Sequence, residues 1–129
     1  MSRSRFIFLA SPQVDGVNEV VGQRITWLLV SPNHRPLGRA GRWFDDLVSA
    51  HGAVDGLREP GKELRVIATA SPARGHWQWR VESDGAVVAV ATRTYLRQNE
   101  CDYNVQRFLE AVPLAEVTGT VRLVRAGQG

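Results

Sequence analysis

The stretch His76-Trp77-Gln78-Trp79-Arg80-Val81-Glu82, followed by Asp84-Gly85, decides the fold of this chain. Its apolar and polar residues alternate strictly, which is the pattern of a strand with one buried face. We therefore expect both tryptophans and Val81 to face a core, while the residues between them face water. Asp84-Gly85 supplies the positive backbone angles of a tight hairpin turn, so residues 86–92 are expected to form the partner strand.

The first half of the chain contains a counterpart of this stretch. At one constant offset, four residues correspond to four others, namely Trp27, Leu29, Ser31 and Trp43 to Trp79, Val81, Ser83 and Tyr95. Ala10-Ser11-Pro12 likewise recurs as Ala70-Ser71-Pro72. A period of roughly 50 residues indicates one supersecondary unit that is used twice.

Working outward, the patterns predict further strands and two helices. The helices are expected at Phe44–Arg58, ended by Pro60-Gly61, and at Leu96–Ala111, ended by Pro113. In the second helix an apolar stripe includes Cys101, which we expect to be buried as a small hydrophobe. The other expected strands are Arg5–Ser11, Arg24–Ser31, Leu37–Gly41, Leu64–Ser71 and Val117–Val124, with a polar loop at Val14–Gly22 and a frayed tail at Ala126–Gly129.

These residues resemble the YegP-like domain, a family of uncharacterised bacterial and archaeal proteins often built as two tandem copies. The resemblance rests on the stretch from Trp77 to Val81, the Asp84-Gly85 turn, Val88-Ala89, Thr92–Tyr95 and the small and apolar positions of the helix that follows. It covers Leu64–Val117 well and Phe6–Arg58 more loosely. The resemblance implies a fold but no established activity.

Together, the repeat and the resemblance predict an α+β protein of two tandem β-β-β-α repeats. The antiparallel sheet would carry both helices on one face, with the copies related by a pseudo-twofold axis. We expect a single domain over residues 1–129, with repeats at about 5–60 and 64–117 and a C-terminal extension at 118–129. A chain of this length can bury a core without a disulfide or metal.

Composition favours a reducing compartment, and we expect a cytoplasmic protein. Cys101 is the only cysteine, which excludes an internal disulfide and cysteine-based zinc sites. The apolar run Phe6–Ala10 is too short for a secretory or membrane segment. The net charge of +3 is diffuse, and Lys62 is the only lysine among the 16 basic residues. A basic excess favours anionic partners, although an arginine-rich composition also arises from genome bias.

The sequence contains no pattern typical of an enzyme, a metal centre or a cofactor site, and we predict none of them. His34, His51 and His76 are scattered, without the spacing of metal ligands. No glycine-rich phosphate-binding motif occurs. Asp45-Asp46 lies at the start of the first expected helix, where carboxylates complement the helix dipole.

Arginine and aromatic residues gather in two similar segments, one before each expected helix. They form a candidate binding patch for anions or partners: Arg39, Arg42, Trp43, Arg93, Tyr95 and Arg97. The alternative is that Trp43 and Tyr95 cover a sheet edge while the arginines are solvated. If the patch binds, nucleic acid is one candidate ligand.

Several strands are apolar on both faces, which favours a protein partner. Two helices cover only one face of the sheet, so a homodimer through the other face would bury the rest. The candidate self-association face comprises Leu28, Val30, Val88 and Val90. The sequence thus favours a non-enzymatic protein-interaction or self-association module, with a nucleic-acid-binding module as the alternative and no membrane partner.

Overall fold

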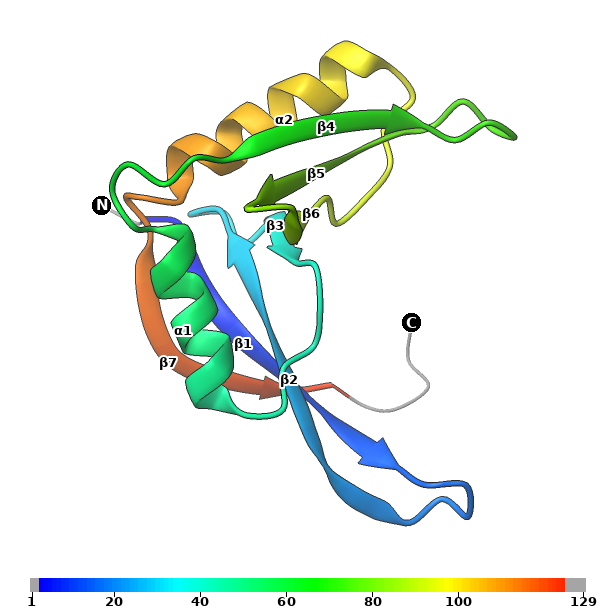
Figure 1. Cartoon of the computed structure of the whole chain (residues 1–129), viewed down its shortest axis with the longest axis vertical. Coiled ribbons are helices and arrows are strands. Elements are labelled where there is room, and N and C mark those ends of the chain that lie inside the picture. The colour runs from blue at the N-terminus through cyan, green and yellow to red at the C-terminus, as the bar shows by residue number, and fades with distance from the viewer. Residues whose placement is uncertain (1–2, 125–129) are drawn as a thin grey trace.

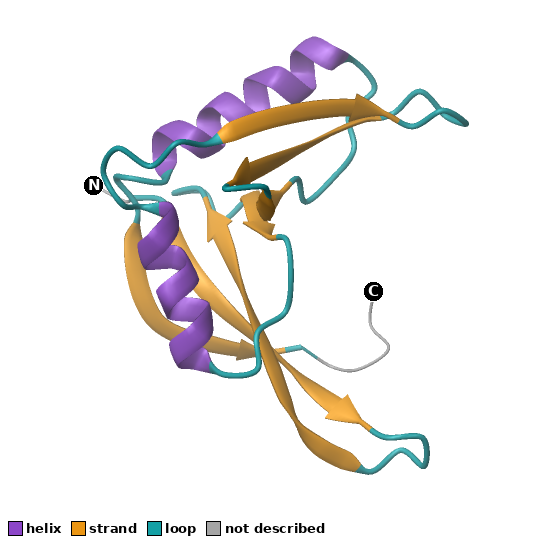
Figure 2. Ribbon diagram, viewed as in Figure 1, coloured by secondary structure: helices purple, strands orange, loops and turns teal. Residues whose placement is uncertain are grey.

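The computed structural model describes residues 3–124, which form one seven-stranded mixed sheet with two helices (Figures 1 and 2). The spatial order of the strands is β4-β5-β6-β3-β2-β1-β7. All neighbours run antiparallel except β1 and β7, which are parallel. The elements are β1 Arg5–Val14, β2 Val20–Val30, β3 Pro36–Ala40, α1 Leu47–Leu57, β4 Arg65–Ala70, β5 Trp77–Ser83, β6 Ala86–Val90, α2 Gln98–Ala111 and β7 Glu116–Leu123.

The expected architecture of two tandem β-β-β-α repeats with an antiparallel sheet and a pseudo-twofold axis is wrong. β3 pairs with β6, so strands from both halves of the chain share one sheet. β7 then adds to β1 in parallel at the far edge, which makes the sheet mixed. Periodicity indicates which face of a strand is buried, but it does not indicate which strands are neighbours.

The predicted hairpin at residues 76–92 is confirmed as β5 and β6. Asp84 and Gly85 have φ values of 52° and 81°, as a tight turn between antiparallel strands requires. The expected loop at Val14–Gly22 is too long, because the β1–β2 ladder continues to the pair Val14 and Val20 and leaves residues 15–19 as the turn. The remaining turn is closed by the Asp15 carboxylate, which accepts hydrogen bonds from the backbone N–H groups of Val17 and Glu19 at 2.9 Å. The expected tail at residues 126–129 lies outside the described residues.

The core lies between the sheet and the two helices. In Figure 1, α1 lies against β1 and β2, while α2 follows β4 and β5. The Phe108 ring of α2 contacts two strand tryptophans, with centroid distances of 6.3 Å to Trp27 and 4.9 Å to Trp79. Trp27, Trp79 and Cys101 are buried, as the alternation and the helical stripe predicted.

Both helices begin later than the sequence predicted. α1 starts at Leu47 because Asp46 is its N-cap, and the Asp46 carboxylate accepts a 2.7 Å hydrogen bond from the Ser49 N–H. α2 starts at Gln98, after Arg97 in extended conformation. No helix within residues 3–124 combines the length and apolar character needed to cross a membrane.

Candidate functional site

A turn between β2 and β3 positions the first side chain of the candidate site. The Ser31 N–H donates to the Arg35 carbonyl at 2.8 Å, and the Ser31 hydroxyl accepts from the Arg35 N–H at 3.1 Å. His34 has a φ of 63° and its N–H donates to the Ser31 carbonyl at 2.9 Å. These bonds fix the backbone at Arg35, so its guanidinium extends from a defined turn.

The segment after β6 contributes the second arginine. Tyr95 forms an isolated antiparallel bridge with Trp77 of β5, with N–O distances of 2.6 and 2.8 Å. The Arg93 guanidinium carbon lies 5.3 Å from the centre of the Tyr95 ring. This cation–π contact holds Arg93 beside a half-buried aromatic ring. Burial raises the pKa of the Tyr95 hydroxyl, although the charge of Arg93 opposes that effect.

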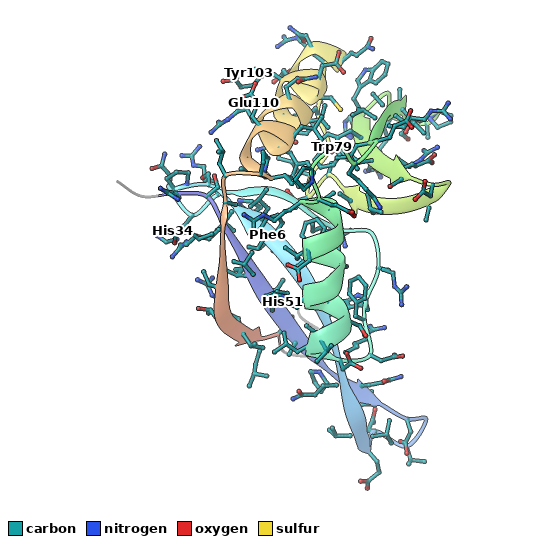
Figure 3. All side chains as sticks on the ribbon, turned by 60° about the vertical axis from the view of Figure 1, so that its left-hand side comes forward. Phe6, His34, His51, Trp79, Tyr103 and Glu110 are labelled. Carbon is teal, nitrogen blue, oxygen red and sulfur yellow. The ribbon has the colours of Figure 1, made fainter. Side chains whose placement is uncertain are left out.

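The third arginine, Arg107, comes from α2. The same helix presents Asn104, whose side-chain oxygen accepts a 2.6 Å hydrogen bond from the Trp79 indole N–H. In Figure 3, Trp79 points toward α2, whereas Tyr103 lies on the outer side of the helix. Phe108 of the same helix is buried in the core and fixes α2 against the sheet. Asn104 and Arg107 therefore have defined positions beside it.

These three elements enclose a cleft of about 610 Å³. Its lining residues are Ser31, Asn33, Arg35, Pro36, Leu37, Thr92, Arg93, Tyr95, Asn104 and Arg107. The lining thus contains three arginines and several hydroxyl and amide groups, but no carboxylate. Among the described residues, none of the three arginines forms an ion pair. We call this region the arginine cleft.

A second cavity of about 540 Å³ adjoins the arginine cleft. It shares Tyr95, Asn104 and Arg107 with the cleft, and adds the exposed ring of Tyr103. The carboxylate at its margin, Glu100, lies 3.6 Å from the Arg97 guanidinium. The shared residues make one continuous surface along α2, with arginines at one end and a free tyrosine at the other.

A further cavity, between α1 and the β5–β6 hairpin, is smaller and more apolar. It measures about 290 Å³, and Phe44, Leu57 and Val87 are among its lining residues. Its charged groups include Lys62 and Asp84, which lie 3.9 Å apart. At the lower limit of volumes typical of ligand sites, it offers less room and less unpaired charge than the arginine cleft.

The structure places the residues of the predicted binding patch in different surroundings. Arg93 and Tyr95 line the arginine cleft. Arg42 stacks over Phe44 at 4.7 Å and borders the apolar cavity, while Trp43 lies beneath the Arg24 guanidinium at 4.9 Å. Arg39 is exposed on β3, and Arg97 pairs with Glu100. The two segments, although similar in sequence, therefore have different surroundings.

Sequence reasoning missed Arg35, Asn104 and Arg107. Arg35 follows a Ser-Pro-Asn-His segment, which has no pattern typical of a binding site. Asn104 and Arg107 lie beside the apolar stripe of α2, where polar residues are expected on any surface helix. No spacing in the sequence links these residues to Arg93, because the sheet topology brings them together.

The predicted self-association face is only partly open. Val30 is buried, with 4% of its surface exposed, and Val88 packs against the core. Leu28 and Val90 are half-buried. Much of the apolar surface expected on this face is thus covered within the chain itself.

Cys101 lies in the core side of α2, and burial raises the pKa of its thiol above the ordinary value. A buried thiol of raised pKa has little of the thiolate that nucleophilic chemistry requires. Across residues 3–124, no cluster of three or more His, Cys, Asp and Glu side chains has an arrangement that could hold a metal ion.

Two solved structures are similar to this chain over nearly its whole length. One is the solution structure of YegP from E. coli, a protein of unknown function, with a TM-score of 0.65, 11% sequence identity, and coverage of 99% of this chain and 98% of that one. The fold is YegP-like. The second is the UPF0339 protein SO3888 from Shewanella oneidensis, with a TM-score of 0.58, 7% identity and 94% coverage of both chains.

The structural likeness confirms the YegP-like fold that the hairpin and its flanking residues suggested. No protein-family model matches the sequence, and no curated protein matches it either. At such low identities the YegP-like fold carries no activity with it. Function must therefore be argued from the arginine cleft itself.

Proposed function

We propose that this chain is a non-enzymatic binding module that takes single-stranded nucleic acid in the arginine cleft. One observation carries the proposal, namely that Arg35, Arg93 and Arg107 line a single cleft without a carboxylate in its lining. Arginine forms bidentate hydrogen bonds with phosphate, and its planar group also stacks on bases. The net charge of +3 attracts a polyanion from a distance.

The aromatic residues favour a single strand over a duplex. Tyr95 lies within the cleft and Tyr103 in the adjoining cavity, where 68% of its surface is exposed. Unpaired bases stack on such rings irrespective of sequence, whereas bases inside a duplex are not available for stacking. Asn104 and the Thr92 and Ser31 hydroxyls add hydrogen-bonding groups between the arginines.

Fluorescence anisotropy with labelled oligouridylate and oligothymidylate tests the proposal. For three phosphate contacts to a single strand, the logarithm of the binding constant should fall against the logarithm of salt with a slope of about −2. Arg93→Gln and Arg107→Gln should each weaken binding and reduce that slope by about 0.7. Arg122→Gln, an equal charge change on the exposed edge strand β7, should leave the slope unchanged.

Absence of binding at low salt would contradict the proposal. So would equal loss of affinity in Arg122→Gln and Arg93→Gln, because that result would indicate diffuse charge rather than a site. A duplex of the same length should bind more weakly, and equal affinity would contradict the stacking role of Tyr103.

Protein interaction, the other function favoured by the sequence, has support from different residues. Leu28 and Val90 are apolar and half-exposed, but Val30 is covered. The structure therefore leaves less apolar surface on this sheet face than the sequence predicted. We also propose a cytoplasmic location, which is supported by a single cysteine that is buried and reduced.

A further inference from the structure

The two edges of the sheet differ in how they are protected. β7, at one edge, has a register shift opposite Phe6 and Phe8, and carries Glu116 and Arg122. β4, at the other edge, pairs with β5 over its full length without a shift. It has no proline or lysine, and Arg65 at its start is its only charged residue. Edges usually carry bulges, prolines or charges that prevent further pairing, and β4 lacks these features after its first residue.

The hydrogen bonds of the hairpin indicate which backbone groups of β4 face outward. The Ser71 N–H donates to the His76 carbonyl at 2.8 Å, so Ser71 bonds toward β5. In an antiparallel pair such bonding alternates, and therefore Thr69, Ile67 and Arg65 also bond toward β5. The residues between them, Val66, Ala68 and Ala70, direct their N–H and C=O groups away from the sheet.

The partners of these residues on β5 confirm the alternation. Trp77 is opposite Ala70 and exchanges backbone hydrogen bonds with Tyr95, on its other side. Trp79 is opposite Ala68, and its carbonyl accepts from the Ala91 N–H at 3.0 Å. Within residues 3–124, no group outside β5 forms a hydrogen bond with the backbone of β4.

We infer that β4 is a self-pairing edge, on which the β4 strand of a second copy of this chain docks antiparallel about a twofold axis at Ala68. A twofold axis perpendicular to the sheet keeps the same face of both copies on the same side. Even-numbered residues of one β4 strand then lie opposite even-numbered residues of the other. With the axis at Ala68, this residue is opposite its own copy, and Val66 is opposite Ala70. These are the residues whose backbone groups point outward, so every outward N–H finds a carbonyl.

Charge and side-chain size favour a second copy as the occupant. In this register Arg65 lies opposite Ser71 of the other copy. The two Arg65 side chains are therefore not opposite each other, and like-charge repulsion across the pair is avoided. The small side chains of Ala68 and Ala70 let the strands approach closely. Val66, 38% exposed beside the edge, would gain apolar cover. The pairing would join two seven-stranded sheets into one and leave the arginine clefts outside the contact.

Sedimentation velocity of the full chain over micromolar to millimolar concentrations tests the inference. The wild-type chain should shift from monomer to dimer, and added salt should favour the dimer because it screens repulsion between two chains of charge +3. Added salt should weaken nucleic-acid binding but not dimerisation. A failure of one proposal is therefore distinguishable from a failure of the other. Val66→Lys should abolish the dimer, because it places a charge on the contact.

Val87→Lys is the matched control. Val87 on β6 is 39% exposed, like Val66, but it lies away from the β4 edge, so its lysine should leave the dimer intact. Ala68→Pro should also abolish the dimer, since it removes the outward N–H at the axis. It removes no hydrogen bond between β4 and β5. Circular dichroism should show that each variant keeps its fold.

Amide hydrogen exchange locates the contact. Protection of Val66, Ala68 and Ala70 should increase with protein concentration, because these amides are free in the monomer. A wild-type chain that stays monomeric at millimolar concentration would overturn the inference. Equal dimerisation of Val66→Lys and Val87→Lys, or concentration-dependent protection at Leu28 and Val90 instead, would overturn it too. Pairing of β4 with an added peptide, without pairing between two copies of the chain, would also overturn the inference. It would indicate that β4 binds a strand of another protein.

Discussion

At the scale of single residues, Gly38 on β3 determines how closely α2 approaches the sheet. A Cβ atom at this position would lie 2.5 and 2.7 Å from two ring carbons of Phe108 and 2.8 Å from a ring carbon of Trp79. Both rings are buried and in contact with each other, so neither is free to move aside. We predict that Gly38→Ala lowers the free energy of unfolding by about 1–3 kcal/mol, as overpacking of a core does. Urea denaturation measures this change.

Gly52→Ala provides a control with the opposite expected sign. Gly52 lies inside α1, and a Cβ atom there would meet no atom within 4 Å. Alanine in an exposed helix interior stabilises by about 1 kcal/mol relative to glycine. If Gly38→Ala left the urea midpoint unchanged, the close packing of Phe108 against β3 would be incorrect.

At the scale of elements, the start of α1 depends on one carboxylate. The backbone hydrogen bond from Ser49, assisted by the Ser49 side chain, lowers the pKa of Asp46 below its ordinary value of 3.8. A lowered pKa in the folded state stabilises the fold above the ordinary pKa, and this contribution is lost as the pH falls through the lowered value. We therefore predict that Asp46→Ala lowers the melting temperature at neutral pH, and that the difference from wild type shrinks in acid. Thermal melts at several pH values measure both effects.

Asp46→Asn separates the hydrogen bond from the charge. Asparagine is an equally good N-cap without a charge, so this variant should melt close to wild type at neutral pH and, because its cap does not titrate, above wild type in acid. A pH-independent deficit in Asp46→Ala would contradict the role of the carboxylate and indicate lost packing instead.

The same elements mark how far sequence reasoning reached. The β5–β6 hairpin was predictable because strand alternation and the Asp84-Gly85 turn are local features. The parallel pairing of β7 with β1 joins segments more than a hundred residues apart, and no local pattern encodes it. Only one part of the arginine cleft could be predicted from the sequence, again because only local patterns are visible there. Arg93 beside Tyr95 forms a visible local pair, whereas Arg35 and Arg107 join it only through the tertiary fold.

At the scale of the whole molecule, the two edges of the sheet differ, because β7 is irregular and charged whereas β4 is regular and almost uncharged. β7 covers β1, whose residues Phe6, Ile7 and Phe8 are almost fully buried. Without β7, the backbone of this apolar strand would be exposed, which favours aggregation. β4 has weaker apolar character at its open edge, where Ala68 and Ala70 are small. This asymmetry allows controlled pairing at one edge while the chain blocks it at the other.

A chain that ends at Ala115 tests this account of β7. The truncation removes the hydrogen bonds from Glu116 N–H to the Ser4 carbonyl at 2.9 Å and from the Thr118 hydroxyl to the Phe6 carbonyl at 3.1 Å. Each such bond contributes about 1 kcal/mol. We therefore predict a clearly lower urea midpoint, together with concentration-dependent aggregates that Val66→Lys does not suppress, because they form through β1. Leu123→Ser, at a position 75% exposed, should match wild type. A truncated chain with the wild-type midpoint would mean that β7 contributes nothing to the stability of the fold.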